Sequence, residues 1–102
     1  MPDVRAIAAA YGVRVELAQL GDWSPATLVA EYDPDGPVIR VNEAALPRGD
    51  SCTVRDAIDR AIAHELYHHR EAIGEIARIR DRRAREAAAD HYASSVTERA
   101  QR

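Results

Sequence analysis

The chain has 102 residues, of which 46% are hydrophobic and 30% are charged, and its net charge is −3. These values predict one soluble globular domain over residues 1–102, and they exclude a disordered chain, a transmembrane protein and an enzyme built from two large lobes. The charge gives no sign of direct nucleic-acid binding. Cys52 is the single cysteine and the N-terminus lacks the apolar core of a signal peptide, so we expect a cytoplasmic protein without a membrane partner.

The first part of the chain predicts one helix and three strands. Residues 3–11 carry apolar side chains at helical spacing, which indicates a short amphipathic helix that ends at Gly12. Residues 13–17 and residues 27–32 alternate apolar with polar side chains, as strands with one buried face do. A third strand is expected over residues 38–42.

The three strands are expected to form a small, mostly antiparallel sheet. Residues 33–37 read Asp-Pro-Asp-Gly-Pro, which favours a turn, so the last two strands should form a hairpin of open register. We expect the third strand to be a sheet edge that borders a cleft and pairs with an extended peptide. Trp23 and Tyr32 are expected in the core or the cleft wall.

Helical patterns follow a loop over residues 43–50. The sequence Thr53-Val54-Arg55-Asp56 resembles a capping box and predicts a helix start at Thr53. An apolar stripe follows along this helix: Val54, Ile58, Ile62, Leu66 and Ile73. Gly74 is the candidate for ending the helix, and the alternative is one helix that continues through residue 80.

This second helix contains the pattern H-E-x-x-H at His64, Glu65 and His68. Histidines four residues apart leave the same face of a helix, so both rings can bind one metal ion. A glutamate beside them can accept the proton of a water activated by that metal. The pattern therefore predicts the centre of a zinc metallopeptidase, with Glu65 as general base and then as proton donor to the leaving amine.

A third expected helix, which carries Glu86 and Asp90, supplies the remaining site residues. Glu86 follows His68 by 18 residues, enough for a helix end, a loop and a new helix, so we expect it to be the third zinc ligand. Asp90 lies one turn further on and is expected to accept the free ring N–H of His64 or His68. Small residues between and after these acids let two helices approach closely. Glu71, Glu75 and Asp90 are the alternatives to Glu86 as ligand.

Together these motifs resemble the ImmA/IrrE family of metallopeptidases over nearly the whole chain. The matching segments are Val38-Ile39-Arg40-Val41-Asn42, then Ala63-His64-Glu65-Leu66-x-His68-His69, then Glu86-x-x-Ala89-Asp90-x-Tyr92-Ala93. The last segment is also similar to the glutamate helix of gluzincins. The resemblance implies a compact α+β fold like that of the minimal gluzincins, zinc as the metal, and endopeptidase activity, often against a repressor protein.

Several other groups carry simpler expectations. His69 should pack or form a hydrogen bond instead of binding metal, and His91 points away from the site. The arginines over residues 78–85 are expected to be a solvated helix end. The residue that stabilises the oxyanion stays open among three tyrosines, Tyr11, Tyr67 and Tyr92. A metal-stabilised, catalytically weak interaction module is the alternative function, and Glu65→Gln separates the two because only a peptidase needs Glu65.

Overall fold

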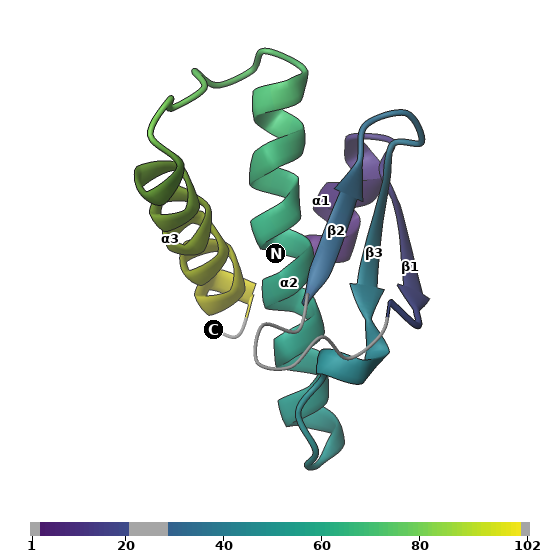
Figure 1. Cartoon of the computed structure of the whole chain (residues 1–102). Coiled ribbons are helices and arrows are strands. Elements are labelled where there is room, and N and C mark those ends of the chain that lie inside the picture. Colours follow the sequence, from purple (N-terminus) through teal and green to yellow (C-terminus); the bar gives the residue numbers. More distant parts are fainter. Residues whose placement is uncertain (1–2, 21–28, 101–102) are drawn as a thin grey trace.

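The computed structural model describes residues 3–20 and 29–100, with side chains described up to residue 97. Its elements are α1 (Val4–Ala10), β1 (Arg14–Ala18), β2 (Ala30–Asp33), β3 (Val38–Asn42), a 3-10 helix (Glu43–Ala45), α2 (Ser51–Ala72) and α3 (Arg82–Ala100). The predicted α+β fold class, with its N-terminal helix, small sheet and two long C-terminal helices, is confirmed (Figure 1). Trp23 lies outside the described residues, as does the start of the predicted second strand.

The first helix is set by local capping. The Asp3 carboxylate accepts a hydrogen bond from the backbone N–H of Ala6 at 2.9 Å, which satisfies one of the donors at the start of α1. Gly12 follows the helix at φ +73°, a conformation that side chains disfavour. The predicted stop at Gly12 is therefore confirmed.

No helix in the described part of the chain is long and apolar enough to cross a membrane.

The sheet has the order β1-β3-β2, so β3 is the central strand. It pairs in parallel with β1, with Arg14 beside Val38, and antiparallel with β2, with Asp33 beside Val38. The expected β2–β3 hairpin is confirmed, and the sheet is mixed where a mostly antiparallel one was expected. The expectation that residues 38–42 form a sheet edge is wrong, because both sides of β3 are paired.

The two open edges are β1 and β2. The chain leaves β1 and enters β2, and then returns to fill the middle of the sheet with β3. Ile39 and Val41 on β3 are fully buried against the helices, as a central strand requires. Leu17 on β1 was expected on a buried face, yet it is 53% exposed because it lies at the outer edge. Val13 is buried and Val15 is partly buried, as predicted.

The long helix α2 begins earlier than predicted. Its N-cap is Asp50, whose carboxylate accepts the N–H of Thr53 at 2.8 Å, so the expected start at Thr53 is wrong. Its end is as predicted: the N–H of Gly74 donates to the carbonyl of Glu71, and the N–H of Glu75 donates to the carbonyl of Arg70. Gly74 has φ +78°, so this is a glycine stop of the Schellman type, and the alternative of a continuous helix is excluded.

Helix α2 lies between the sheet and α3, so it contacts every layer of the fold (Figure 1). Its buried positions recur at helical spacing, whereas Ile73, expected in the apolar stripe, is 53% exposed at the helix end. The core residues are Val4, Ala8, Val13, Ala30, Ile39, Val41, Ile58, Ala61, Ile62, Ala63, Leu66 and Ala93. One helix thus carries both the main core stripe and, on its flank, the H-E-x-x-H residues.

Helix α3 packs on α2 through small side chains. Asp81 precedes it and accepts the N–H of Ala84 at 3.0 Å, which caps the helix start. Ala89, Ala93 and Thr97 are buried and four residues apart, so they form one stripe. The Thr97 hydroxyl donates to the Ala93 carbonyl at 2.8 Å, which satisfies the polar group in this stripe.

The packing predicts a large difference between two isoleucines on α2. Ile62 is fully buried, so Ile62→Ala should lower the free energy of unfolding by about 2–5 kcal/mol. Ile73→Ala is the control, and it should change that free energy by less than about 0.5 kcal/mol because Ile73 is exposed. Urea denaturation followed by circular dichroism measures both values. Equal effects of the two substitutions would contradict the core described above.

Candidate metal centre

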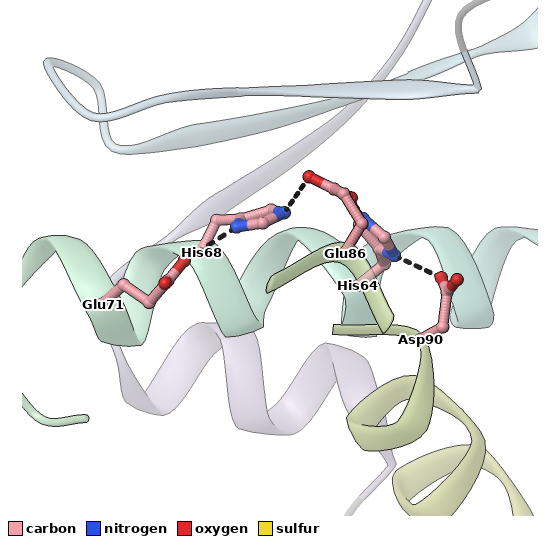
Figure 2. Close-up of polar contacts among 5 residues, drawn as sticks. All are labelled: His64, His68, Glu71, Glu86 and Asp90. Atoms are coloured by element: carbon pink, nitrogen blue, oxygen red, sulfur yellow. Dashed lines mark hydrogen bonds and ion pairs between the residues drawn. The ribbon is translucent and has the colours of Figure 1, made fainter. Parts of the chain in front are cut away.

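Helices α2 and α3 bring two imidazoles and one carboxylate to one point. Nε2 of His64 lies 2.8 Å from one oxygen of Glu86, and Nε2 of His68 lies 3.4 Å from the other (Figure 2). Ligand atoms of these three residues lie within 4.8 Å of one another. The histidines are one helical turn apart on α2, and Glu86 reaches them from the first turns of α3. The structure therefore brings together the three residues predicted as metal ligands.

The second nitrogen of His64 has its own carboxylate. Nδ1 of His64 lies 2.8 Å from Oδ1 of Asp90, a distance at which the carboxylate accepts a hydrogen bond from the ring N–H (Figure 2). Asp90 follows Glu86 by one helical turn, so both acids of α3 contact the same ring from its two nitrogens. This is the contact that the sequence predicted for Asp90. Its side chain is 74% exposed, so water competes for this hydrogen bond.

The corresponding partner of His68 is Glu71, a contact that the sequence analysis did not identify. Nδ1 of His68 lies 2.9 Å from Oε1 of Glu71, three residues further along α2 (Figure 2). The Glu71 side chain is only 7% exposed, in contrast to that of Asp90. A carboxylate on the second ring nitrogen fixes which nitrogen faces a metal. Residues three apart on a helix are neighbours, so the sequence did contain a signal for this pair.

Glu71 also faces a second pocket beside His68. This pocket, of ≈ 370 Å³, is lined by Glu71, His68, Ala72, Arg78 and Arg85. The other carboxylate oxygen of Glu71 and Nε of Arg85 are both buried without a hydrogen-bond partner among the described residues. The two arginines of the pocket lining, Arg78 and Arg85, bring positive charge to the same pocket as this carboxylate.

Glu65 lies in the main cleft together with the three candidate ligands. Burial raises the pKa of the Glu65 carboxyl above its ordinary value, and the neighbouring Glu86 adds to this effect, while His64 and His68 oppose it. A carboxylate with a raised pKa is a stronger proton acceptor, which suits a general base. The position of Glu65 is thus compatible with the role that its place in the motif predicts.

The cleft of ≈ 570 Å³ runs between the edge strand β2 and the two helices. Its lining residues are Val29, Ala30, Ala57, Arg60, Ala61, His64, Glu65, His68, Arg82, Glu86 and Asp90. Tyr11, Tyr67 and Tyr92, the three tyrosines considered as oxyanion partners, are not part of this described lining. The cationic groups of the cleft wall, apart from the histidines, are Arg60 and Arg82, one turn before His64 and Glu86 respectively.

The remaining histidines lie apart from the metal ligands, as expected. His69 is buried, and its Nδ1 lies 2.6 Å from the hydroxyl oxygen of Tyr32, which packs against the core. Burial lowers the pKa of His69, so the neutral ring is favoured. His91 is exposed on α3. Both expectations are confirmed. Tyr32 is partly buried and packs against the core, and its contact with His69 joins β2 to α2.

The alternative ligands and the arginine run are also placed by the structure. Glu75 accepts a hydrogen bond from the hydroxyl of Tyr11 at 2.8 Å, so it is engaged away from the candidate ligands. The arginines at the start of α3 and before it are mostly exposed, as predicted for a solvated helix end, although Arg82 lines the main cleft and Arg85 is partly buried. Among the described residues, the one group that could hold a metal ion is His64, His68 and Glu86.

The donor set of the site fits zinc. Two imidazole nitrogens and one carboxylate oxygen are a known ligand set of catalytic zinc, which keeps its fourth position open to the substrate side. Here the three donors line an open cleft, and each histidine has a carboxylate on its other nitrogen. Comparisons of the chain with protein-family models, with curated proteins and with solved structures found no match.

The buried contact of Glu71 predicts its effect on metal binding. Glu71→Ala should weaken zinc affinity by about 10–100-fold, because His68 loses the partner that orients its ring. The zinc affinity of Glu71→Gln should lie between those of the wild type and Glu71→Ala, since an amide oxygen can still accept a hydrogen bond from the ring N–H. Glu75→Ala is the matched control on the same helix end and should bind zinc like the wild type. Competition titration with a coloured zinc chelator measures all four proteins, and equal affinities would show that Glu71 does not support the site.

Proposed function

We propose that this chain is a zinc-dependent endopeptidase that hydrolyses peptide bonds of a protein substrate. One observation carries the proposal: three candidate zinc ligands converge at an open cleft in which a partly buried glutamate, Glu65, stands beside them. Helix α2 supplies His64, His68 and Glu65 in the spacing that metallopeptidases use, and α3 supplies Glu86. The resemblance of these segments to the ImmA/IrrE family adds the expectation of a repressor or another regulatory protein as substrate.

The protein groups have distinct roles in this proposal. A zinc ion would act as a Lewis acid on the scissile carbonyl and lower the pKa of the attacking water. Glu65 takes the proton from that water and passes it to the leaving amine, so one carboxylate serves both halves of the reaction. His64 and His68 keep Nε2 towards the cleft because Asp90 and Glu71 occupy their Nδ1 sides.

The alternative function, a metal-stabilised interaction module, needs no proton acceptor beside the metal. Retaining a carboxylate there is costly, since burial raises the pKa of Glu65, and this cost is more readily explained by catalysis. We also propose that the protein works in the cytoplasm, where the exposed thiol of Cys52 stays reduced.

Strand β2 is the proposed binding edge for the substrate backbone. The N–H of Asn42 donates to the Val29 carbonyl at 2.9 Å, so Val29 and Glu31 direct their backbone groups towards β3. The backbone groups of Ala30 and Tyr32 therefore point to the outer edge, and Ala30 lines the cleft. An extended peptide can pair with this edge while its scissile bond reaches the metal centre. Strand β2 thus takes the role that was expected of the strand at residues 38–42.

Substitutions at Glu65 and Glu86 separate catalysis from metal binding. Glu65→Gln should keep about one zinc per chain but lower turnover by about 10²–10⁴-fold, because the general base is lost. Glu86→Ala should lose zinc and, with it, the thermal stability that bound zinc adds to the native state. Zinc is measured by atomic emission, and cleavage by mass spectrometry of a tryptic peptide library. Cleavage by Glu65→Gln at the wild-type rate would sink the peptidase proposal and leave the interaction module.

Proline substitutions on the two sheet edges test the binding strand. Ala30→Pro removes an outward N–H beside the cleft and should lower turnover about tenfold or more while zinc binding persists. Leu17→Pro removes an outward N–H from the opposite edge, β1, and should leave turnover unchanged. Both variants are assayed after circular dichroism and zinc analysis show that they fold. If folded, zinc-loaded Ala30→Pro cleaves as fast as the wild type, the substrate is not held by β2.

A further inference from the structure

Strand β1 forms the sheet edge that faces away from the metal centre (Figure 1). Successive residues of a strand direct their backbone N–H and C=O groups to opposite sides of it. The N–H of Arg14 donates to the Pro37 carbonyl at 3.1 Å, so the backbone groups of Arg14 point towards β3. The backbone groups of Val15 and Leu17 therefore point outward. The described residues offer these groups no partner, so β1 is an unpaired edge of the kind that other strands join.

An apolar groove accompanies this edge. It has a volume of ≈ 370 Å³ and is lined by Arg5, Ala9, Val13, Val15, Leu17 and Ile58. Leu17 is one of the few large hydrophobic residues that are strongly exposed in the described chain, at 53%. An exposed leucine beside an open strand edge indicates an interaction surface more strongly than either feature alone. The question is what pairs with it.

We infer that two copies of this chain associate through their β1 strands, antiparallel about a two-fold axis at Val15. In this arrangement Val15 of each copy exchanges backbone hydrogen bonds with Val15 of the other, and Leu17 lies opposite Val13. Arg14 of each copy then stands opposite Glu16 of the other, in the pair type whose side chains lie closest. The two sheets become one, and the exposed Leu17 is covered.

Charge selects this register over its neighbours. The residues of β1 whose backbone groups point outward are odd-numbered, so every possible register places odd residues opposite odd residues. Of the two nearest alternative registers, one places Arg14 opposite Arg14 and the other places Glu16 opposite Glu16. Like charges directly opposite one another are destabilising. The register centred on Val15 avoids both contacts and forms two opposite-charge pairs. The strand is thus complementary to a second copy of itself.

The charges around Glu16 also favour a second copy. Arg40 lies within 4 Å of three carboxylates on the outer sheet face, those of Glu16, Glu31 and Asp33. Three carboxylates thus surround one guanidinium on this face, and the excess negative charge favours the approach of a positively charged side chain such as Arg14 of a second copy. Arg14 forms no ion pair with the described residues, so it is available to contact Glu16 of a partner copy. The inference does not depend on the proposed peptidase activity, since β2 is the opposite edge of the sheet (Figure 1). The described lining of the cleft includes residues of β2 and the helices and none of β1.

Sedimentation equilibrium of the full chain over micromolar concentrations tests this pairing. The wild type should associate reversibly to a dimer, and the affinity should be modest because one short strand pair buries less surface than a standard interface. Arg14→Glu and Glu16→Arg each place like charges opposite one another, so each should weaken the dimer about tenfold or more. A wild type that stays monomeric throughout this range would overturn the inference.

Mixing the two charge variants gives the sharper test. A chain with Arg14→Glu and a chain with Glu16→Arg have complementary charges at both contacts, so a heterodimer should form where neither variant dimerises alone. A loss of folding in either variant cannot produce this rescue. If the mixture sediments as monomers, or if the single variants dimerise like the wild type, the proposed pairing of β1 strands is wrong.

Two exposed apolar residues provide the matched control. Leu17→Asp should abolish the dimer because it places a charge opposite Val13 of the partner copy. Ile73→Asp should leave it unchanged, since Ile73 is equally exposed, at 53%, but lies at the end of α2. Both variants should bind zinc like the wild type, which separates this test from that of the metal centre. Equal association of the two variants would overturn the inference.

Discussion

The close approach of α2 and α3 is the constraint on which the site depends. Helix α2 alone presents two imidazoles, and a third donor reaches them only if another helix passes within a side-chain length. The buried stripe of Ala89 and Ala93 allows this distance, because a larger residue there would push Glu86 away from His64. The alanines of α3 therefore shape the candidate site through their small size. The same approach brings Asp90 to the far nitrogen of His64.

Much of this arrangement could be predicted from the sequence because its signals are local. Apolar spacing marks the helices, alternation marks the strands, and Gly74 marks the end of α2 through a backbone conformation that glycine adopts easily. The spacing of His64 and His68 fixes a common face whatever the tertiary structure. Glu86 and Asp90 could be assigned because residues one turn apart on a helix face the same neighbour.

The parts that the sequence did not predict depend on competition or on distant contacts. The first such part is the order of the strands. Nothing in residues 38–42 shows whether this strand is paired on one side or on both, and its central position depends on β1, which is distant in sequence. The start of α2 is another, because Asp50 and Thr53 can both cap a helix and the carboxylate is the stronger acceptor here. The role of Glu71 is a third: its spacing from His68 allows the contact, but the burial of its side chain depends on residues beyond α2 that line the same pocket.

The most direct measurement on the metal centre is X-ray absorption at the zinc edge of the purified, zinc-loaded protein. A site built from His64, His68 and Glu86 predicts nitrogen and oxygen ligands at about 2.0–2.2 Å, with the multiple scattering of two imidazole rings. A sulfur ligand at about 2.3 Å would place the metal at Cys52 instead. That result, or a spectrum without imidazole scattering, would contradict the account of a zinc site shared by α2 and α3.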